Sequence, residues 1–235
     1  MSDKLISVVI PAHNEEKQIA KCLCSIRTAS MKLPEGSVET VIIADRCTDR
    51  TEEIAKDFDC LVVKNNNEMT LSALINMGVL VASGKILLIL SPDCRISDYT
   101  LIEIHQMLRT KKYIGGGMFE KPERLSMGIL ASSVYETVIN LPEMMRKKSP
   151  VFYQSFWCLK KVFNEMGGFN ETLTEDCFAD FVKRLKVYGE SVGKKYALLQ
   201  CSTLARSTRR FDLNGDWYPI KENPYVKKAM EKMKG

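Results

Sequence analysis

The chain has 235 residues, of which 45% are hydrophobic and 27% are charged, and this composition is typical of a folded globular protein. The formal net charge is only +5, from 34 Lys and Arg against 29 Asp and Glu, and the basic residues are scattered. This charge pattern argues against a nucleic-acid-binding protein.

The eight cysteines form no Cys-x-x-Cys pair, and with only two histidines a zinc site of the usual spacing is not expected. Most cysteines lie in apolar stretches, which favours free buried thiols in a reducing cytosol. No stretch reaches the ~18 apolar residues of a membrane span, and the N-terminus lacks the apolar core of a signal peptide. We therefore expect a cytoplasmic protein, with peripheral membrane contact as an alternative.

The first half of the sequence alternates apolar, β-branched runs with segments whose apolar residues recur at helical spacing. Strands are predicted over residues 6–12 ("ISVVIPA"), 38–45 ("VETVIIAD"), 60–64 ("CLVVK") and 85–90 ("KILLIL"). A helix is expected after each strand, and the first three have Asn14, Asp49 and Thr70 as candidate caps. Apolar strands alternating with helices imply an α/β fold with a mostly parallel, Rossmann-like sheet covered by helices on both faces.

The second half is less regular. Strands are predicted at residues 113–119, 151–159 and 195–200, and helices over residues 125–142 and around Phe178 to Leu185, where Gly189 is the expected end. The residues from Ala205 onward are predicted to form a basic, loop-like tail. Because no repeat or clear linker interrupts the chain, we expect a single domain made of fused parts.

Two carboxylates stand directly after apolar strands. Asp45 ends the second strand and Asp93 follows the fourth, where Pro92 has no backbone N–H for the sheet ladder. In parallel sheets ligands bind beyond the carboxyl ends of the strands, and unpaired burial of a carboxylate would be costly. The pair therefore suits a divalent cation with a bound diphosphate, although Asp45 and Asp49 alone are equally consistent with turn caps.

A third acidic position is the pair Glu175-Asp176, ahead of the apolar face of a helix. Acidic residues there commonly complement the helix dipole. The same dipole would keep an aspartate ionised, as a general base acting on an alcohol requires.

Four segments in series carry a resemblance to a known family. The segments "SVVIPAHNEE", "IIADRCTDRT", "ASGKILLILSPDCRIS" and "GGFNETLTEDCFADFVKRL" are similar in order and spacing to the family 2 glycosyltransferases of GT-A fold, over residues 5–190. The resemblance implies an inverting enzyme that moves a sugar from a nucleotide-diphosphate donor, UDP-linked in our prediction, to a glycan or lipid-linked acceptor. It also divides the domain into a nucleotide-sugar half (1–110), an acceptor half (111–200) and a basic tail (201–235).

The resemblance also assigns roles to residues. Contacts to the nucleotide fall on Pro11, Ala12, Glu15 and Asp45, while Ser91, Pro92 and Asp93 take the place of the Asp-x-Asp element, with Asp93 as ligand of Mg²⁺ or Mn²⁺. Asp176 corresponds to the catalytic base that deprotonates the acceptor hydroxyl, and Glu175 positions the acceptor.

Three positions depart from the family pattern. Ser91 replaces the first acid of the metal element, Arg46 stands where a second acid is frequent, and Arg50 replaces a common glycine. Because a serine removes one negative charge, metal affinity is expected to be lower than usual, and a member that binds nucleotide without turnover is the alternative. Three tail arginines are candidates to neutralise the diphosphate or are simply solvated: Arg206, Arg209 and Arg210.

The segment from 118 to 150 is where we expect acceptor specificity. Its apolar residues at helical spacing are read as core in preference to an exposed stripe that docks a lipid-linked acceptor. These residues are Leu125, Ile129, Leu130, Val134, Val138 and Leu141. A nucleotidyltransferase is a weak third reading, because "PAHNEEKQIA" is not a glycine-rich triphosphate loop.

Overall fold

A computed structural model describes residues 4–147, 155–173 and 176–223. Within these ranges the chain divides into two compact units. Unit 1 consists of residues 1–120 and 152–205, and unit 2 consists of residues 121–151 and 206–235.

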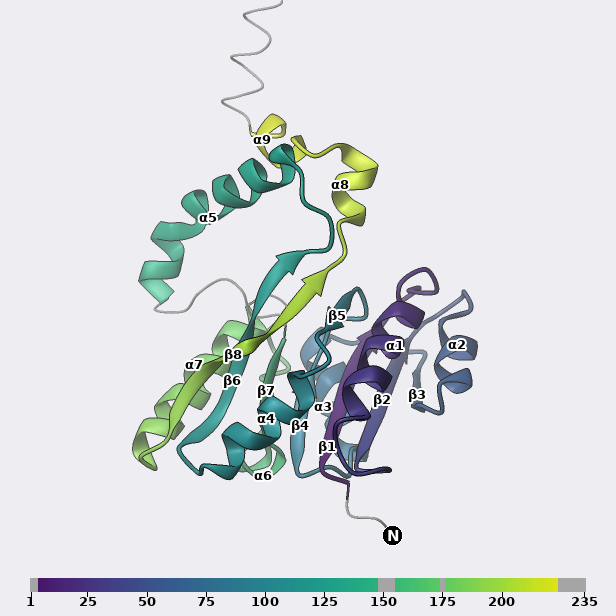
Figure 1. The fold of residues 1–235 in the computed structure, drawn as a ribbon, viewed down its shortest axis with the longest axis vertical. Coiled ribbons are helices and arrows are strands. Elements are labelled where there is room, and N and C mark those ends of the chain that lie inside the picture. The colour runs from purple at the N-terminus through teal and green to yellow at the C-terminus, as the bar shows by residue number, and fades with distance from the viewer. Residues whose placement is uncertain (1–3, 148–154, 174–175, 224–235) are drawn as a thin grey trace, which may run out of the picture. The chain divides into compact units, whose positions relative to one another are not determined.

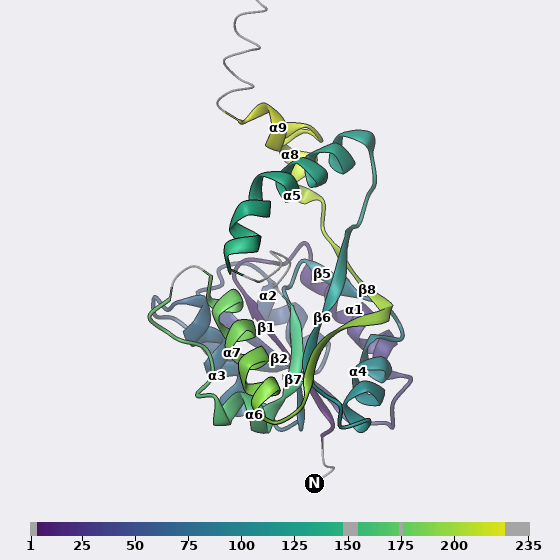
Figure 2. The same ribbon diagram turned by 90° about the vertical axis from the view of Figure 1, so that its left-hand side faces the viewer.

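Unit 1 is an α/β structure around one eight-stranded sheet (Figures 1 and 2). Its strands are β1 (Ile6–Ala12), β2 (Val38–Asp45), β3 (Leu61–Asn65), β4 (Ile86–Ile89), β5 (Cys94–Ile96), β6 (Tyr113–Pro122), β7 (Phe156–Leu159) and β8 (Lys195–Arg206). Its helices are α1 (Ile19–Ser30), α2 (Thr51–Asp57), α3 (Leu71–Val81), α4 (Thr100–Arg109), α6 (Lys160–Glu165) and α7 (Cys177–Ser191).

The strand order is β3-β2-β1-β4-β7-β6-β8-β5. β1 pairs in parallel with β2 and β4, and β2 with β3, whereas β7 is antiparallel to both β4 and β6. The first four strands therefore follow the 3-2-1-4 order of a nucleotide-binding α/β sheet, with its switch point between β1 and β4.

Helices cover both faces of this sheet because its strands are apolar on both sides. Successive residues of β1 point alternately to the two faces, so Val8 and Ile10 pack with α1, α2 and α4, and Val9 packs with α3. The second face also receives α6 and α7, whose Phe163 and Phe181 have ring centroids 5.0 Å apart. This two-sided core fixes the strand ends where the sequence predicts a site.

Most predicted elements of unit 1 are confirmed. β1 and β2 have the predicted bounds, and Thr70 caps α3 by accepting a hydrogen bond from the Ala73 N–H at 3.2 Å. Several predicted boundaries are wrong. α1 begins at Ile19 rather than near Asn14, and α7 continues through Gly189 to Ser191. The strands predicted at 113–119 and 195–200 continue to Pro122 and Arg206. The turn after α7 instead uses Gly193, whose φ of +66° an L side chain rarely adopts.

Unit 2 contains α5 (Met127–Lys147), α8 (Arg209–Asn214) and α9 (Tyr218–Lys221). The Arg124 guanidinium donates to Asp212 and Asp216, both at 2.7 Å, and the Ser132 hydroxyl donates to the Asp216 carbonyl oxygen at 2.8 Å. Hydrogen bonds from Arg124 and Ser126 lower the pKa of Asp216 to about 2. The prediction of a loop-like tail is therefore wrong for residues 205–221, because β8, α8 and α9 occupy most of that segment.

The prediction that the apolar residues of the segment 125–142 are buried in the core is also mostly wrong. Ile129 is fully buried as predicted, but four of the other positions are exposed: Leu125, Leu130, Val134 and Val138. Leu141 lies outside the residues whose side chains are described. The reason is that α5 buries its small residues, Gly128 and Ser132, against α9 and the turn before it.

Candidate active site at the strand ends

The carboxyl ends of β1, β2, β3 and β4 meet at one edge of the sheet. In the parallel registers Ala12 lies beside Ala44, and Asp45 lies beside Asn65. The Leu90 N–H donates to the Val9 carbonyl oxygen at 3.1 Å, so Ser91 leaves the sheet next to Pro11. The structure therefore brings together Pro11, Ala12, Asp45 and Ser91, as the sequence predicts.

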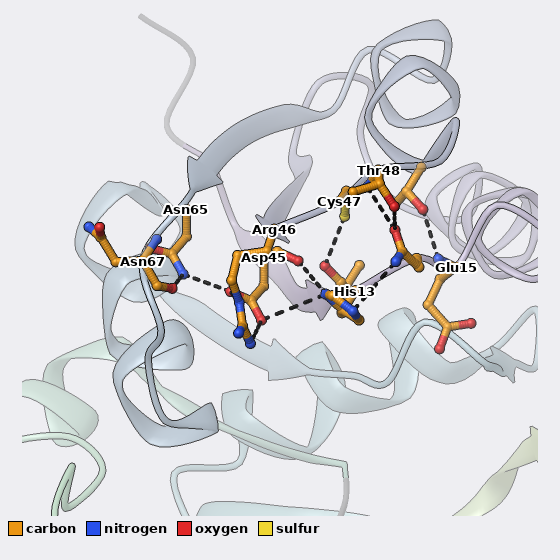
Figure 3. A network of polar contacts seen from close by, with 11 residues as sticks. His13, Glu15, Asp45, Arg46, Cys47, Thr48, Asn65 and Asn67 are labelled. Atoms are coloured by element: carbon orange, nitrogen blue, oxygen red, sulfur yellow. Dashed lines mark hydrogen bonds and ion pairs between the residues drawn. The ribbon is translucent and has the colours of Figure 1, made fainter.

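Asp45 is the centre of a polar network at this edge (Figure 3). The Asn65 amide donates to its Oδ1 at 2.7 Å, and Arg46 donates through Nε to Oδ1 at 3.2 Å and through Nη2 to Oδ2 at 3.0 Å. His13 Nδ1 donates to the Asp45 carbonyl oxygen at 2.7 Å. The buried carboxylate is therefore held in a fixed orientation by residues at the ends of β2 and β3, while His13, after β1, holds the backbone of Asp45.

The network keeps Asp45 ionised. Burial alone would raise the pKa of this carboxyl group, but hydrogen bonds from Arg46 and Asn65, together with the positive charge of Arg46, outweigh it and hold the pKa below its ordinary value. An ionised acceptor at a strand end suits recognition of N–H or O–H donors on a ligand.

The loops after β1 and β2 are tied to each other. Asn14 Oδ1 accepts from the Thr48 N–H at 2.8 Å, and the Glu15 N–H donates to Thr51 Oγ1 at 2.8 Å. Asn14 therefore links the two loops and does not cap α1. The predicted cap Asp49 does hold the start of α2, since its Oδ1 accepts from the Thr51 N–H at 3.0 Å. Glu15 is buried, and Figure 3 shows it at the end of this network.

The turn after β4 carries Ser91, Pro92 and Asp93. The Ser91 hydroxyl donates to Asp93 Oδ1 at 2.6 Å, and the Cys94 thiol lies 3.5 Å from the same oxygen. Asp93 itself is half-buried. The serine that replaces the expected acid thus orients the remaining carboxylate.

The donor set of this turn fits a divalent cation only in part. Mg²⁺ is usually held by one or two carboxylates together with substrate phosphates, and Asp93 supplies one such oxygen pair. No group of three or more His, Cys, Asp or Glu side chains that could hold a metal ion occurs among the described residues. A cation here would therefore take most of its ligands from the donor and water.

Asp176 stands directly before α7 in a left-handed backbone conformation, with a φ of +57°. It is exposed and occupies the N-cap position of α7, where its side chain makes no capping hydrogen bond. This position is compatible with a carboxylate that complements the helix dipole and with a general base. Glu175 lies outside the described residues. Among the five non-glycine residues with positive φ in the described chain, Asp176 is a predicted site residue, and Asn14 and Arg46 adjoin the predicted site residues Glu15 and Asp45.

The tail arginines belong to unit 2. Arg206 ends β8, and Arg209 and Arg210 begin α8. Arg210 Nη2 donates to Glu136 Oε2 at 2.7 Å, so its charge already has an acidic partner. Contact of these arginines with a donor diphosphate remains a prediction.

Sequence reasoning missed Asn65 and His13. Both follow or end a strand on the same edge as Asp45, so the strand-end rule that selected Asp45 applies to them as well. Asn65 is neutral and stands among three consecutive asparagines in "KNNN", so a search for carboxylates at strand ends does not find it.

The model of glycosyl transferase family 2 matches residues 7–164, which is more than half of the chain. The chain belongs to glycosyl transferase family 2. Among curated relatives, Glycosyltransferase GlyA of Streptococcus pneumoniae is 28% identical over 92% of this chain and 32% of its own length. Glycosyltransferase AglE of Haloferax volcanii is 35% identical over 38% of this chain and 30% of its own length. This family 2 chain thus spans about a third of the relatives' length.

Solved structures share the fold. Residues 1–349 of TarS of S. aureus in complex with UDP-GlcNAc superpose with a TM-score of 0.66 at 17% identity, over 87% of this chain and 59% of that TarS segment. Glucosyl-3-phosphoglycerate synthase of Mycobacterium tuberculosis, in complex with Mn²⁺, UDP and phosphoglyceric acid, superposes with a TM-score of 0.61 at 17% identity, over 92% of this chain and 76% of the synthase. The predicted GT-A α/β fold is therefore confirmed. None of the described helices is long and apolar enough to cross a membrane.

Proposed function

We propose that this family 2 chain is an inverting glycosyltransferase that moves a sugar from a UDP-sugar donor to an acceptor hydroxyl. The observation that carries the proposal is the ionised Asp45 at the β2 end, oriented by Arg46 and Asn65 and on the same sheet edge as the Ser91–Asp93 turn. This edge is the switch point where α/β sheets bind nucleotides. Solved proteins of this fold that hold UDP or UDP-GlcNAc support the choice of donor.

In this proposal the nucleotide lies along the ends of β1 and β2. Asp45 accepts a hydrogen bond from an N–H or O–H of the base or ribose, and Pro11, Ala12 and Glu15 line the same edge. Asp93 would hold Mg²⁺ or Mn²⁺ together with the donor diphosphate. The cation would neutralise charge that develops on the leaving diphosphate.

Asp176 is the proposed general base, and Glu175 is proposed to position the acceptor. The carboxylate of Asp176 takes the proton of the acceptor hydroxyl as the oxygen forms a bond to the anomeric carbon. The bond from that carbon to the diphosphate oxygen breaks on the opposite side, and its electron pair leaves with UDP. One displacement of this kind inverts the anomeric configuration.

The backbone of Asp176 supports this role. A non-glycine residue at a φ of +57° is held in a costly conformation, and such residues concentrate at active sites. Asp176 is also exposed to solvent, as a base that meets an acceptor hydroxyl must be.

The test is sugar transfer by the purified chain with UDP-glucose and UDP-GlcNAc, Mn²⁺, and a panel of sugar and lipid acceptors, with UDP release and product both measured. Asp176→Asn is expected to lower the rate by about 10²- to 10⁴-fold, as loss of a general base does, and to leave UDP affinity unchanged. Asp57→Asn, an exposed carboxylate at the end of α2, is the control. Full activity of Asp176→Asn would show that another group is the base.

A second candidate function is binding of nucleotide without turnover. It is favoured by Ser91, whose hydroxyl occupies the position of an acid and hydrogen-bonds Asp93. UDP binding in calorimetry without turnover of any donor would support it. Transfer that depends on Asp176 would exclude it.

A further inference from the structure

Positive charge is concentrated in unit 2. Residues 121–151 and 206–235 contain 13 Lys and Arg against 7 Asp and Glu, a net charge of +6. The remaining residues contain 21 Lys and Arg against 22 Asp and Glu, a net charge of −1. The net charge of +5 of the whole chain is therefore due to the 61 residues of unit 2, and the rest of the chain is close to neutral.

The same unit exposes an apolar stripe along α5. Met127, Leu130, Val134 and Val138 are spaced by three, four and four residues, so they lie on one face of the helix. Their exposed fractions are 77%, 52%, 56% and 61%. On α8 of the same unit, Leu213 is also exposed. We call the four α5 residues the α5 stripe.

The opposite face of α5 already has its partners. A Cβ at Gly128 would lie 2.7 Å from the Trp217 ring nitrogen and 2.7 Å from the Asp216 Cβ, so the segment leading into α9 packs directly on the helix backbone. Ser132 donates to the Asp216 carbonyl oxygen on this face. Because small residues face inward, the large apolar residues of the stripe are left outside.

We propose that unit 2 docks on an anionic lipid surface through the α5 stripe. A helix with an apolar face in a basic context lies in the membrane interface, with the apolar face among the headgroups and acyl chains. Each Lys or Arg near such a surface contributes about 1 kcal/mol of attraction to anionic lipid. A second copy of the chain is a poorer occupant, because two units of charge +6 would repel each other.

The experiment is sedimentation of the full chain with vesicles of phosphatidylcholine alone and of phosphatidylcholine with phosphatidylglycerol. We expect binding to the anionic vesicles that weakens as salt rises, since added ions screen the attraction. Leu130→Gln/Val134→Gln is expected to weaken this binding by roughly tenfold or more, from the loss of apolar area.

Two variants separate the contributions. Leu80→Gln/Val187→Gln changes two exposed apolar residues of unit 1 and is expected to bind like the unchanged chain. Lys121→Gln/Lys221→Gln removes two exposed charges of unit 2 and is expected to weaken binding to anionic vesicles only. All substituted side chains are exposed, so circular dichroism should show an unchanged fold.

Three results would overturn the proposal: no vesicle binding, equal binding to neutral and anionic vesicles, or equal losses in the stripe variant and in the unit 1 control. A dimer in analytical ultracentrifugation that the stripe substitutions abolish would also overturn it, because the stripe would then bind a second copy. Donor binding does not enter this assay, so its outcome is independent of the proposed transfer reaction.

Discussion

At the scale of single residues, Arg46 is the clearest departure from the family pattern whose role the structure explains. It stands where a second acid is frequent, yet its guanidinium holds the Asp45 carboxylate through two hydrogen bonds. A φ of +46° turns its backbone so that this contact between sequence neighbours is possible. Arg46 thus places a counter-ion for Asp45 where a second negative charge is frequent in the family.

Arg46→Ala is expected to raise the pKa of Asp45. Burial raises this pKa, and the substitution removes the hydrogen bonds and the positive charge of Arg46 that lower it. The folded-state pKa is normally depressed, so the ionised form persists as pH falls below the ordinary carboxyl range. Calorimetry at a series of pH values should show that UDP affinity is lost, as the pH falls, at a higher pH in Arg46→Ala than in the unchanged chain. Arg50→Ala is the control, because Arg50 pairs with Glu53. Loss of UDP affinity at the same pH in both proteins would contradict the proposed role of Asp45.

Ser91→Asp restores the acid expected at that position. A second carboxylate about 4 Å from a divalent cation adds about 2 kcal/mol even at the dielectric constant of water, so Mn²⁺ affinity in the presence of UDP should rise by roughly tenfold or more. Manganese binding followed by electron paramagnetic resonance is the measurement, and Ser97→Asp is the control. Equal Mn²⁺ affinity in Ser91→Asp and the unchanged chain would argue against a cation at Asp93.

At the scale of elements, β6 lies very close to its neighbours at Gly116. A Cβ there would lie 1.9 Å from the Ala197 carbonyl oxygen and 2.4 Å from the Trp157 ring. Gly78 on α3 is also crowded, but its nearest neighbours are the side-chain ends of Ile43 and Val9. A side-chain end can move aside more easily than a backbone carbonyl, so an added Cβ should be tolerated better at Gly78 than at Gly116.

Gly116→Ala is expected to cost about 3 kcal/mol or more, which corresponds to a fall in melting temperature of roughly 6–12 °C. Gly78→Ala should cost less, because alanine gains up to about 1 kcal/mol of helix propensity there. Thermal unfolding followed by circular dichroism tests the difference. A larger loss for Gly78→Ala would contradict this account of β6.

The elements also show what the sequence could predict. The strands β1 to β4 and the helices that cover them follow from unbroken apolar runs and helical spacing, which the two-sided core requires. The second half resisted prediction because its burial depends on partners far along the chain. Ile129 and Leu130 are adjacent and equally apolar, yet only the contacts of α5 with residues 216–217 decide which one is buried.

At the scale of the whole molecule, the eight thiols are distributed over both faces of the sheet and are all free. Cys24 and Cys201 are exposed, whereas four are buried: Cys22, Cys94, Cys158 and Cys177. Burial raises the pKa of Cys22 and Cys158, and it raises the pKa of Cys60 to about 11. The prediction of free thiols is therefore confirmed, although only half of them are fully buried.

In the folded protein, a disulfide reagent such as dithionitrobenzoate should therefore react rapidly with two thiols, slowly with Cys47 and Cys60, and with the other four only on unfolding. The reagent's absorbance against time gives the three classes, and the fully unfolded chain is the control with eight equivalents. Reductant should leave the free energy of unfolding unchanged. A reductant-dependent change would mean that a disulfide forms.

The two segments of unit 2 are synthesised at different times, because the whole second part of unit 1 lies between them in the chain. Arg124, which precedes α5, is made 88 and 92 residues before its partners Asp212 and Asp216. At about 5–20 residues per second, that interval is roughly 5–20 s on the ribosome. During this time both the inward and outward apolar residues of α5 are uncovered. The nascent chain is therefore most vulnerable to chaperone capture or early lipid contact before α8 and α9 emerge.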